Sequence, residues 1–229
     1  LLPENQEKLF FSDNGSTATE IGIKMALQYH HNLGKKRSVL MAFEDGFHGD
    51  TFGAMSVSGL SVYNGPFEDY FIEVKRIPVP TDANLEGLLH ELENTMDLDA
   101  VAGFIYEPLV QGAAAMKMHK AEHLEKILKV IKSHGVLAIA DEVMTGFGKT
   151  GRHFASDYMT EKPDIICMSK ALTAGMLPMA VTSCTQNVYD AFYSDDIAKG
   201  LFHGHTYTAN PLACAAALAG IELLKSEEI

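Results

Sequence analysis

Six short apolar segments, rich in β-branched and aromatic residues, recur along the chain. Segments of this length and composition predict β-strands. They occupy residues 9–11, 39–43, 101–106, 136–140, 165–168 and 179–183.

Helical patterns separate several of these predicted strands. Apolar residues recur at spacings of three and four in residues 16–33, 85–92, 124–134 and 212–224. Strands that alternate with helices predict crossover connections and a mainly parallel sheet between two helical layers, which is an α/β fold. In such a sheet, ligands bind beyond the carboxyl ends of the strands.

Two of the predicted strands end on chemically informative residues. Asp141 follows one of them, and Lys170 follows another, 29 positions later. A lysine held where solvent is scarce has its ammonium form destabilised and can form a Schiff base with an aldehyde. A neighbouring carboxylate can keep a pyridine nitrogen protonated, so the pair indicates a pyridoxal phosphate site. Alone, Lys170 also fits an ordinary strand-end lysine whose charged head reaches water.

The segment after the first predicted strand leads directly into a helix. Gly15 lets the backbone approach an anion, the first helical N–H groups are unpaired, and Ser16 adds a hydroxyl donor, so a phosphate would fit. On this segment alone, an ordinary helix cap formed by Asn14 or Ser16 is favoured. His203 and His205 have no acidic or cysteine partner nearby, so no metal site is predicted.

Composition limits the class of protein. The 229 residues predict one large domain, and the net charge of −12, without a basic cluster, argues against a nucleic-acid partner. No apolar run approaches the roughly 20 residues that span a bilayer, so we expect a cytoplasmic protein without a membrane partner. The chain begins without Met and stops after a strong helix, so a piece of a longer polypeptide is expected.

Four motifs resemble those of class III pyridoxal-phosphate aminotransferases in their order and spacing. They are NGSTATE at 14–20, GFHGDT at 46–51, DEVMTGFGKTG at 141–151 and SKAL at 169–172. The resemblance implies a transferase of fold type I, with residues 1–229 as its cofactor-binding large domain. The N-terminal segment and the C-terminal small domain of the family have no counterpart in this sequence, which leaves open that the chain alone is inactive.

The resemblance assigns roles to individual residues. Lys170 would form the Schiff base with pyridoxal 5′-phosphate and shuttle a proton, and Asp141 would pair with the pyridinium nitrogen. Phe47 and Val143 would lie against the two faces of the ring. The phosphate would be held by Gly15 and Ser16 and, across a homodimer interface, by the loop that contains Gly204, His205 and Thr206.

The same resemblance gives three residues a place near the substrate, namely Phe47, Lys170 and Gly204. Two departures from the family pattern stand out, because Phe47 replaces a common Tyr and His205 replaces a common Pro. For Glu107, a supporting role behind the cofactor pocket and a plain structural role are both open.

Two motifs narrow the expected substrates. GFHGDTFGAMSV at 46–57 and EPLVQGA at 107–113 are most similar to the subfamily that transfers an amino group from S-adenosylmethionine to 8-amino-7-oxononanoate in biotin biosynthesis. Enzymes of the ornithine, acetylornithine and 4-aminobutyrate type usually carry Gln at the position of Met144. Enzymes of this type remain the alternative enzyme prediction. A non-catalytic fragment of the fold is the alternative in which the chain is not an enzyme.

Overall fold

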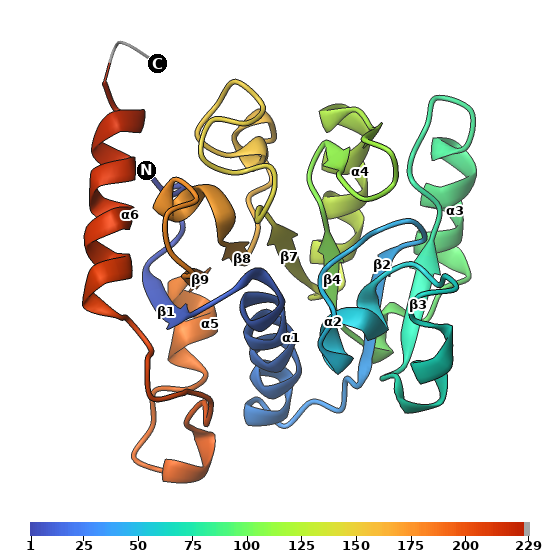
Figure 1. Ribbon diagram of the computed structural model, residues 1–229. Coiled ribbons are helices and arrows are strands. Elements are labelled where there is room, and N and C mark those ends of the chain that lie inside the picture. The colour runs from blue at the N-terminus through green and yellow to red at the C-terminus, as the bar shows by residue number, and fades with distance from the viewer. Residues whose placement is uncertain (227–229) are drawn as a thin grey trace.

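A seven-stranded mixed sheet forms the centre of the computed structural model, which describes residues 1–226 (Figure 1). The strands lie in the order β1-β9-β8-β7-β4-β2-β3; β8, β7, β4, β2 and β3 are parallel, and β9 is antiparallel to both of its neighbours. Their bounds are β1 Lys8–Ser12, β2 Val39–Phe43, β3 Val74–Ile77, β4 Val101–Tyr106, β7 Leu137–Asp141, β8 Ile165–Met168 and β9 Ala180–Cys184; β5 (Val110–Gln111) and β6 (Lys117–Met118) form a separate short hairpin.

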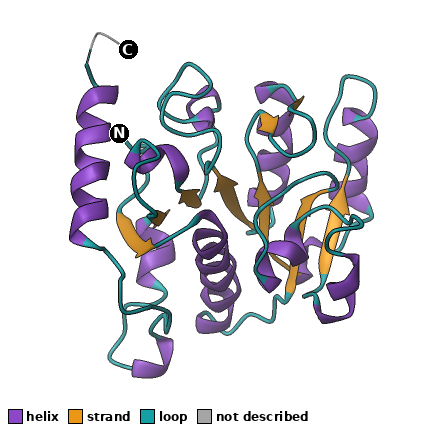
Figure 2. Cartoon of the chain, in the orientation of Figure 1, coloured by secondary structure: helices purple, strands orange, loops and turns teal. Residues whose placement is uncertain are grey.

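Helices cover both faces of this sheet (Figure 2). One layer contains α1 (Gly15–Asn32), α2 (Phe52–Val57) and α5 (Gln186–Asp190), and the other contains α3 (Leu85–Asn94), α4 (Ala121–Ser133) and α6 (Pro211–Leu224). Short 3₁₀ helices lie in the connections: η1 Gly65–Tyr70, η2 Leu98–Ala100, η3 Ala155–Tyr158, η4 Lys170–Thr173 and η5 Ile197–Lys199. Figure 1 shows α1 in front of the sheet and α6 at its left edge.

Two apolar cores hold the layers together. Leu40 and Ile139 point to the α1 side, whereas Met41 and Ala138 point to the α4 side, and all four are fully or almost fully buried. Adjacent residues of a strand face opposite sides of the sheet, so a strand buried on both faces reads as a continuous apolar run. The predicted α/β architecture with a mainly parallel sheet between helical layers is confirmed.

All six predicted strands are present, with ends that differ by about one residue from the prediction. The sequence did not reveal β3, because Lys75 and Arg76 interrupt its apolar character at the edge of the sheet. The predicted helices are also present, and Gly135 follows α4 with a φ of 73°, the left-handed conformation expected of a C-terminal cap. Residues 227–229, which the predicted domain includes, lie outside the described residues.

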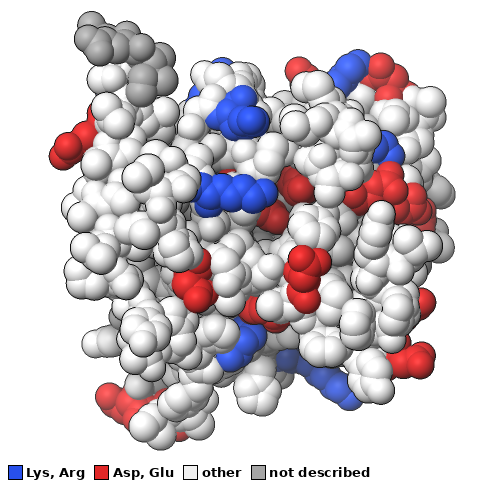
Figure 3. Space-filling view, in the orientation of Figure 1, with Lys and Arg blue, Asp and Glu red and all other residues white. Residues whose placement is uncertain are grey.

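Two surface properties bear on possible partners. Within residues 1–226, no helix combines the length and the apolar character needed to cross a bilayer. On the face shown in Figure 3, basic side chains are scattered among acidic and uncharged ones and form no continuous band.

Candidate functional site

A cleft of about 530 Å³ opens where the parallel strands end. Asp141 is the last residue of β7, Lys170 follows β8 by two positions, and β7 and β8 are parallel neighbours. The carboxyl ends of parallel strands meet at one edge of a sheet, so both side chains line this cleft. The cleft also includes four further residues predicted for the site, Gly15, Ser16, Phe47 and Val143.

The Asp141 carboxylate is buried and held at both oxygens. Oδ2 lies 2.7 Å from Nδ1 of His48, and Oδ1 accepts a hydrogen bond of 3.0 Å from the backbone N–H of Val143. Only 4% of the surface of Asp141 is exposed. A carboxylate can only accept hydrogen bonds, so the Nδ1 atom of His48 carries the hydrogen of this contact. A carboxylate fixed in this way can receive a protonated ring nitrogen without reorienting.

The helix start at the cleft combines a cap with free donors. The side chain of Asn14 accepts from the Thr17 N–H at 3.0 Å, and Thr17 Oγ1 accepts from the Asn14 N–H at 3.2 Å. This is the ordinary cap anticipated from the sequence. It leaves the N–H groups of Gly15 and Ser16 without an acceptor in the described part of the chain. The cap and an anion site are therefore compatible, because they use different N–H groups.

Gly15 lies directly against Val143. A Cβ atom on Gly15 would come within 2.9 Å of Val143 Cγ1, closer than such atoms approach in folded proteins. Glycine thus lets the helix start and the Val143 side chain line one cleft together. Phe47 also lines the cleft, with 44% of its surface exposed. Contact of Phe47 and Val143 with opposite faces of a bound ring remains a prediction.

Lys170 differs from the expectation in one respect. The sequence predicted that the lysine is shielded from solvent, but its side chain is exposed at the rim, because it begins η4 beyond the end of β8. Nothing between residues 1 and 226 covers it. Its backbone is left-handed, with a φ of 45°, a conformation that costs a residue with a side chain about 1–2 kcal/mol. Such local strain is a feature of functional positions.

The loop predicted to reach a partner's phosphate lies outside this cleft. Gly204 and Thr206 are exposed, and His205 Nε2 lies 3.8 Å from Asp13 Oδ1. The structure of one chain therefore does not bring Gly204, His205 and Thr206 to Asp141. Their predicted role at the site of a second copy is untested.

The sequence reasoning gave no role to His48. This residue belongs to the quoted motif at 46–51, yet the motif alone does not indicate that its imidazole contacts the carboxylate 93 positions later. Glu107, which was left open between two roles, also lines the cleft and is buried. Among the described residues, no group of three or more His, Cys, Asp or Glu side chains has an arrangement suited to a metal ion.

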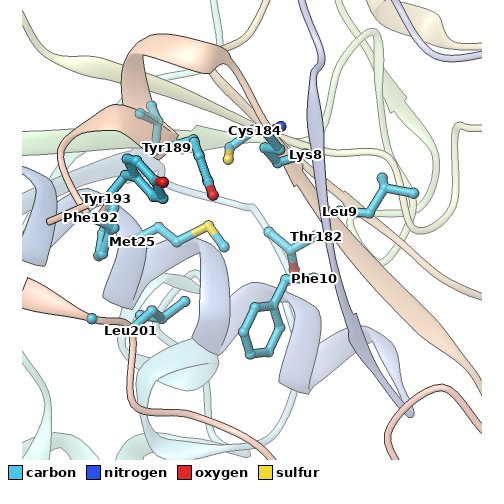
Figure 4. A pocket seen from close by; sticks show the side chains of 12 residues that line it. Lys8, Leu9, Phe10, Met25, Thr182, Cys184, Tyr189, Phe192, Tyr193 and Leu201 are labelled. Atoms are coloured by element: carbon cyan, nitrogen blue, oxygen red, sulfur yellow. The ribbon is translucent and has the colours of Figure 1, made fainter. Parts of the chain in front are cut away.

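A second cavity of about 320 Å³ lies elsewhere, between α1, α5 and the strands β1 and β9 (Figure 4). Its lining is mostly apolar and aromatic, including Phe10, Met25 and Phe192. Lys8 lies over the ring of Tyr189, 4.7 Å from its centre. Because this cavity has no carboxylate and none of the predicted residues, the strand-end cleft is the candidate active site.

Comparison with known proteins identifies the family of this chain. The family described as aminotransferase class-III matches residues 1–229. The chain belongs to the class-III aminotransferase family. Adenosylmethionine-8-amino-7-oxononanoate aminotransferases of Synechococcus elongatus and Geobacter sulfurreducens are 47% and 41% identical to it; the aligned regions cover the whole chain and 56% and 54% of those proteins.

Solved structures of aminotransferases and transaminases have the same fold. The crystal structure of the adenosylmethionine-8-amino-7-oxononanoate aminotransferase from Methanocaldococcus jannaschii matches with a TM-score of 0.90 and 37% identity, over 99% of this chain and 53% of that one. The PLP-bound amine transaminase of an uncultivated Pseudomonas species matches with a TM-score of 0.92 and 32% identity, over 98% and 54%. The chain therefore spans about half the length of the relatives that it matches.

The donor set of this class-III chain fits pyridoxal phosphate. The N–H groups of Gly15 and Ser16 suit the phosphate, the buried Asp141 suits the ring nitrogen, and Lys170 offers a primary amine at the same cleft. The close approach of Gly15 to Val143 gives the ring an apolar wall beside the phosphate donors. The fit thus rests on five positions of this sequence.

Proposed function

We propose that this chain is the cofactor-binding large domain of a pyridoxal-phosphate-dependent aminotransferase. The observation that carries the proposal is the buried, doubly held carboxylate of Asp141 in the same cleft as Lys170. When bound, pyridoxal phosphate supplies an electron-accepting ring. Asp141 would hold the ring nitrogen in its protonated form, and Lys170 would supply the primary amine for the aldehyde and a base for proton transfer.

The remaining cleft residues orient the ring and keep water away from it. Gly15 and Ser16 bind the phosphate, which sets the position of the ring relative to Lys170. Phe47 and Val143, which line the same cleft, would contact the ring and help to fix its orientation. The exposure of Lys170 in this chain means that further cover must come from the rest of the polypeptide or from a second copy.

For the substrates, we propose S-adenosylmethionine as amino donor and 8-amino-7-oxononanoate as acceptor, giving 7,8-diaminononanoate in biotin biosynthesis. The names of relatives that are 36–47% identical support this choice. Met144 supports it as well, since it lines the cleft where ornithine- and 4-aminobutyrate-type enzymes usually carry Gln. The working form would be a cytoplasmic homodimer, in which Gly204, His205 and Thr206 complete the partner's site.

A second candidate is another class-III transaminase reaction on an ω-amino acid or amine. This candidate is motivated by the structural matches, which include an ω-transaminase from Thermomicrobium roseum with a TM-score of 0.91 at 29% identity. The folds of these enzymes do not separate the two reactions.

The amino donor tests the proposal directly. The full-length protein, loaded with pyridoxal phosphate, is mixed with S-adenosylmethionine, ornithine or 4-aminobutyrate, and the cofactor absorbance is followed. We expect the band of the loaded enzyme to fade with S-adenosylmethionine alone. Fading with ornithine or 4-aminobutyrate instead would support the second candidate, and no cofactor band at all would support a non-catalytic fold.

A further inference from the structure

Three buried titratable side chains line the strand-end cleft together. His48 comes from the loop after β2, Glu107 directly follows β4, and Asp141 ends β7. These strands are adjacent in the order β7-β4-β2, so their ends meet at one edge of the sheet. The three residues are 4%, 5% and 4% exposed, respectively.

The hydrogen bonds of this cluster are incomplete. His48 uses Nδ1 to contact Asp141 at 2.7 Å, but its Nε2 atom is buried and has no partner in residues 1–226. Glu107 Oε2 is likewise buried without a partner among these residues. Folded proteins leave few buried polar atoms unpaired, so two of them beside one cleft call for a specific explanation.

Burial also changes the acidity of Glu107. It raises the pKa of this carboxyl group to about 7. The charge of His48 lowers this pKa, the charge of Asp141 raises it, and hydrogen bonds from the N–H groups of Gly112 and Phe47 lower it. A carboxylic acid with this pKa keeps a proton in a large share of molecules at neutral pH.

Few charged groups surround the Glu107 carboxyl group. The Nε2 atom of His119 lies 3.0 Å from the Glu107 carbonyl oxygen, and burial lowers the pKa of the His119 imidazole, so it stays neutral. Lys170 is the one Lys or Arg residue among those that line the cleft. The charges of His48 and Asp141 are the ones that act on Glu107.

We propose that Glu107, buried with an unpartnered oxygen beside His48 and Asp141, stays uncharged at neutral pH and so leaves Asp141 as the one carboxylate that faces the bound group, which makes Glu107 a positioning residue for that group. The identity of that group rests on the function proposed above. With Glu107 neutral, Asp141 presents a single negative charge to the cleft. When Glu107 ionises, a second negative charge enters the same buried volume as Asp141.

Infrared difference spectroscopy of the full-length protein without cofactor tests the proton directly. Spectra are recorded between about pH 5.5 and 8.5 for the wild type, Glu107→Gln and the surface control Glu122→Gln. We expect a protonated-carboxyl band that titrates with a midpoint near 7 in the wild type and the control and is lost in Glu107→Gln. An unchanged titration in Glu107→Gln would overturn the proposal.

Cofactor affinity over the same pH range tests the consequence for the cleft. We expect the Kd for pyridoxal phosphate to contain a transition near pH 7 that Glu107→Gln loses, while its Kd at pH 6 stays within about threefold of the wild type. Glu107→Asp keeps a titratable acid and should restore a transition at a shifted midpoint, which a purely structural role does not predict.

The two experiments separate the inference from the proposed function. If the wild type binds no pyridoxal phosphate, the proposed function fails, and the infrared band still decides whether Glu107 is protonated. If the wild type binds it and Glu107→Gln keeps the full pH transition, only the role of Glu107 is refuted.

Discussion

The Nδ1 atom of His48 lies 2.7 Å from Oδ2 of Asp141, and both side chains are almost fully buried. The contact joins the loop after β2 to the end of β7, across the intervening strand β4. It fixes the orientation of a carboxylate whose other oxygen is held by the backbone of Val143. Asp141 is thus positioned before any ligand arrives.

Loss of the imidazole should weaken cofactor binding. We expect His48→Ala to raise the Kd for pyridoxal phosphate about 10- to 100-fold, because a charge-assisted hydrogen bond contributes roughly 1.5–3 kcal/mol. His48→Asn places an amide donor near the position of Nδ1 and should recover part of the affinity. His90→Ala, on the exposed face of α3, is the control. Equal affinities for His48→Ala and the control would show that Asp141 needs no such support.

The contact between Gly15 and Val143 predicts a pair of compensating substitutions. Gly15→Ala should weaken cofactor binding at least tenfold, because its new Cβ would lie 2.9 Å from Val143 Cγ1 and displace the helix start. Val143→Ala removes the opposing methyl groups, so the double variant should bind more tightly than Gly15→Ala alone. Isothermal titration of the three variants measures this coupling, and strictly additive losses would contradict it.

The stability of the protein should depend on Glu107 and pH. The carboxyl group has a pKa of about 7 in the fold against 4.5 in an exposed position, so the native state binds the extra proton between these values. Stability from this group is complete below pH 4.5 and is lost as the pH rises through 7. Each pH unit in that window contributes about 1.4 kcal/mol, or about 3 kcal/mol across it.

Glu107→Gln cannot ionise and should therefore unfold at higher denaturant concentration than the wild type at pH 8. Urea unfolding at pH 8 and at pH 5 measures the difference, and Glu122→Gln on the surface of α4 controls for the change in net charge. A variant that is less stable than the wild type at pH 8 would refute the predicted sign.

Glu142, the neighbour of Asp141, should matter for folding rather than for the cofactor. Its buried carboxylate accepts hydrogen bonds from the N–H groups of Ala155 and Ser156, at 3.1 and 2.7 Å, and from the Thr145 hydroxyl. Glu142→Ala should lower the free energy of unfolding by roughly 3 kcal/mol, since three buried donors lose their partner. Chemical unfolding checks the loss, and Glu122→Ala should have almost no effect.

The sequence predicted the sheet well because its central strands are buried on both faces. Apolar runs such as residues 101–106 follow from that burial, so they are recognisable without tertiary information. β3 was missed since Lys75 and Arg76 belong to an edge strand, where burial does not dictate an apolar run. The short hairpin of β5 and β6 was also missed, because two-residue strands have no periodicity.

The site residues could be predicted only where the residue type and its position at a strand end together indicate a chemical role. Asp141 and Lys170 could be identified because each lies at or just after the end of a strand, and the ends of neighbouring parallel strands lie close together. The contact of His48 with Asp141 was not predictable, since 93 residues separate them and the approach depends on how the loop after β2 packs. The prediction that Lys170 is shielded from solvent was wrong, because the burial of a residue at a strand end depends on other segments, which the strand's own sequence does not reveal.

The central claim is that Lys170 carries the cofactor. The full-length protein is incubated with pyridoxal phosphate, reduced with borohydride and digested, and the modified peptide is identified by mass spectrometry; Lys149→Ala, on an exposed loop, serves as the control. We predict that the pyridoxyl group is found on Lys170 in the wild type and the control and is absent from Lys170→Ala. A pyridoxyl group on any other lysine in the wild type would contradict the account.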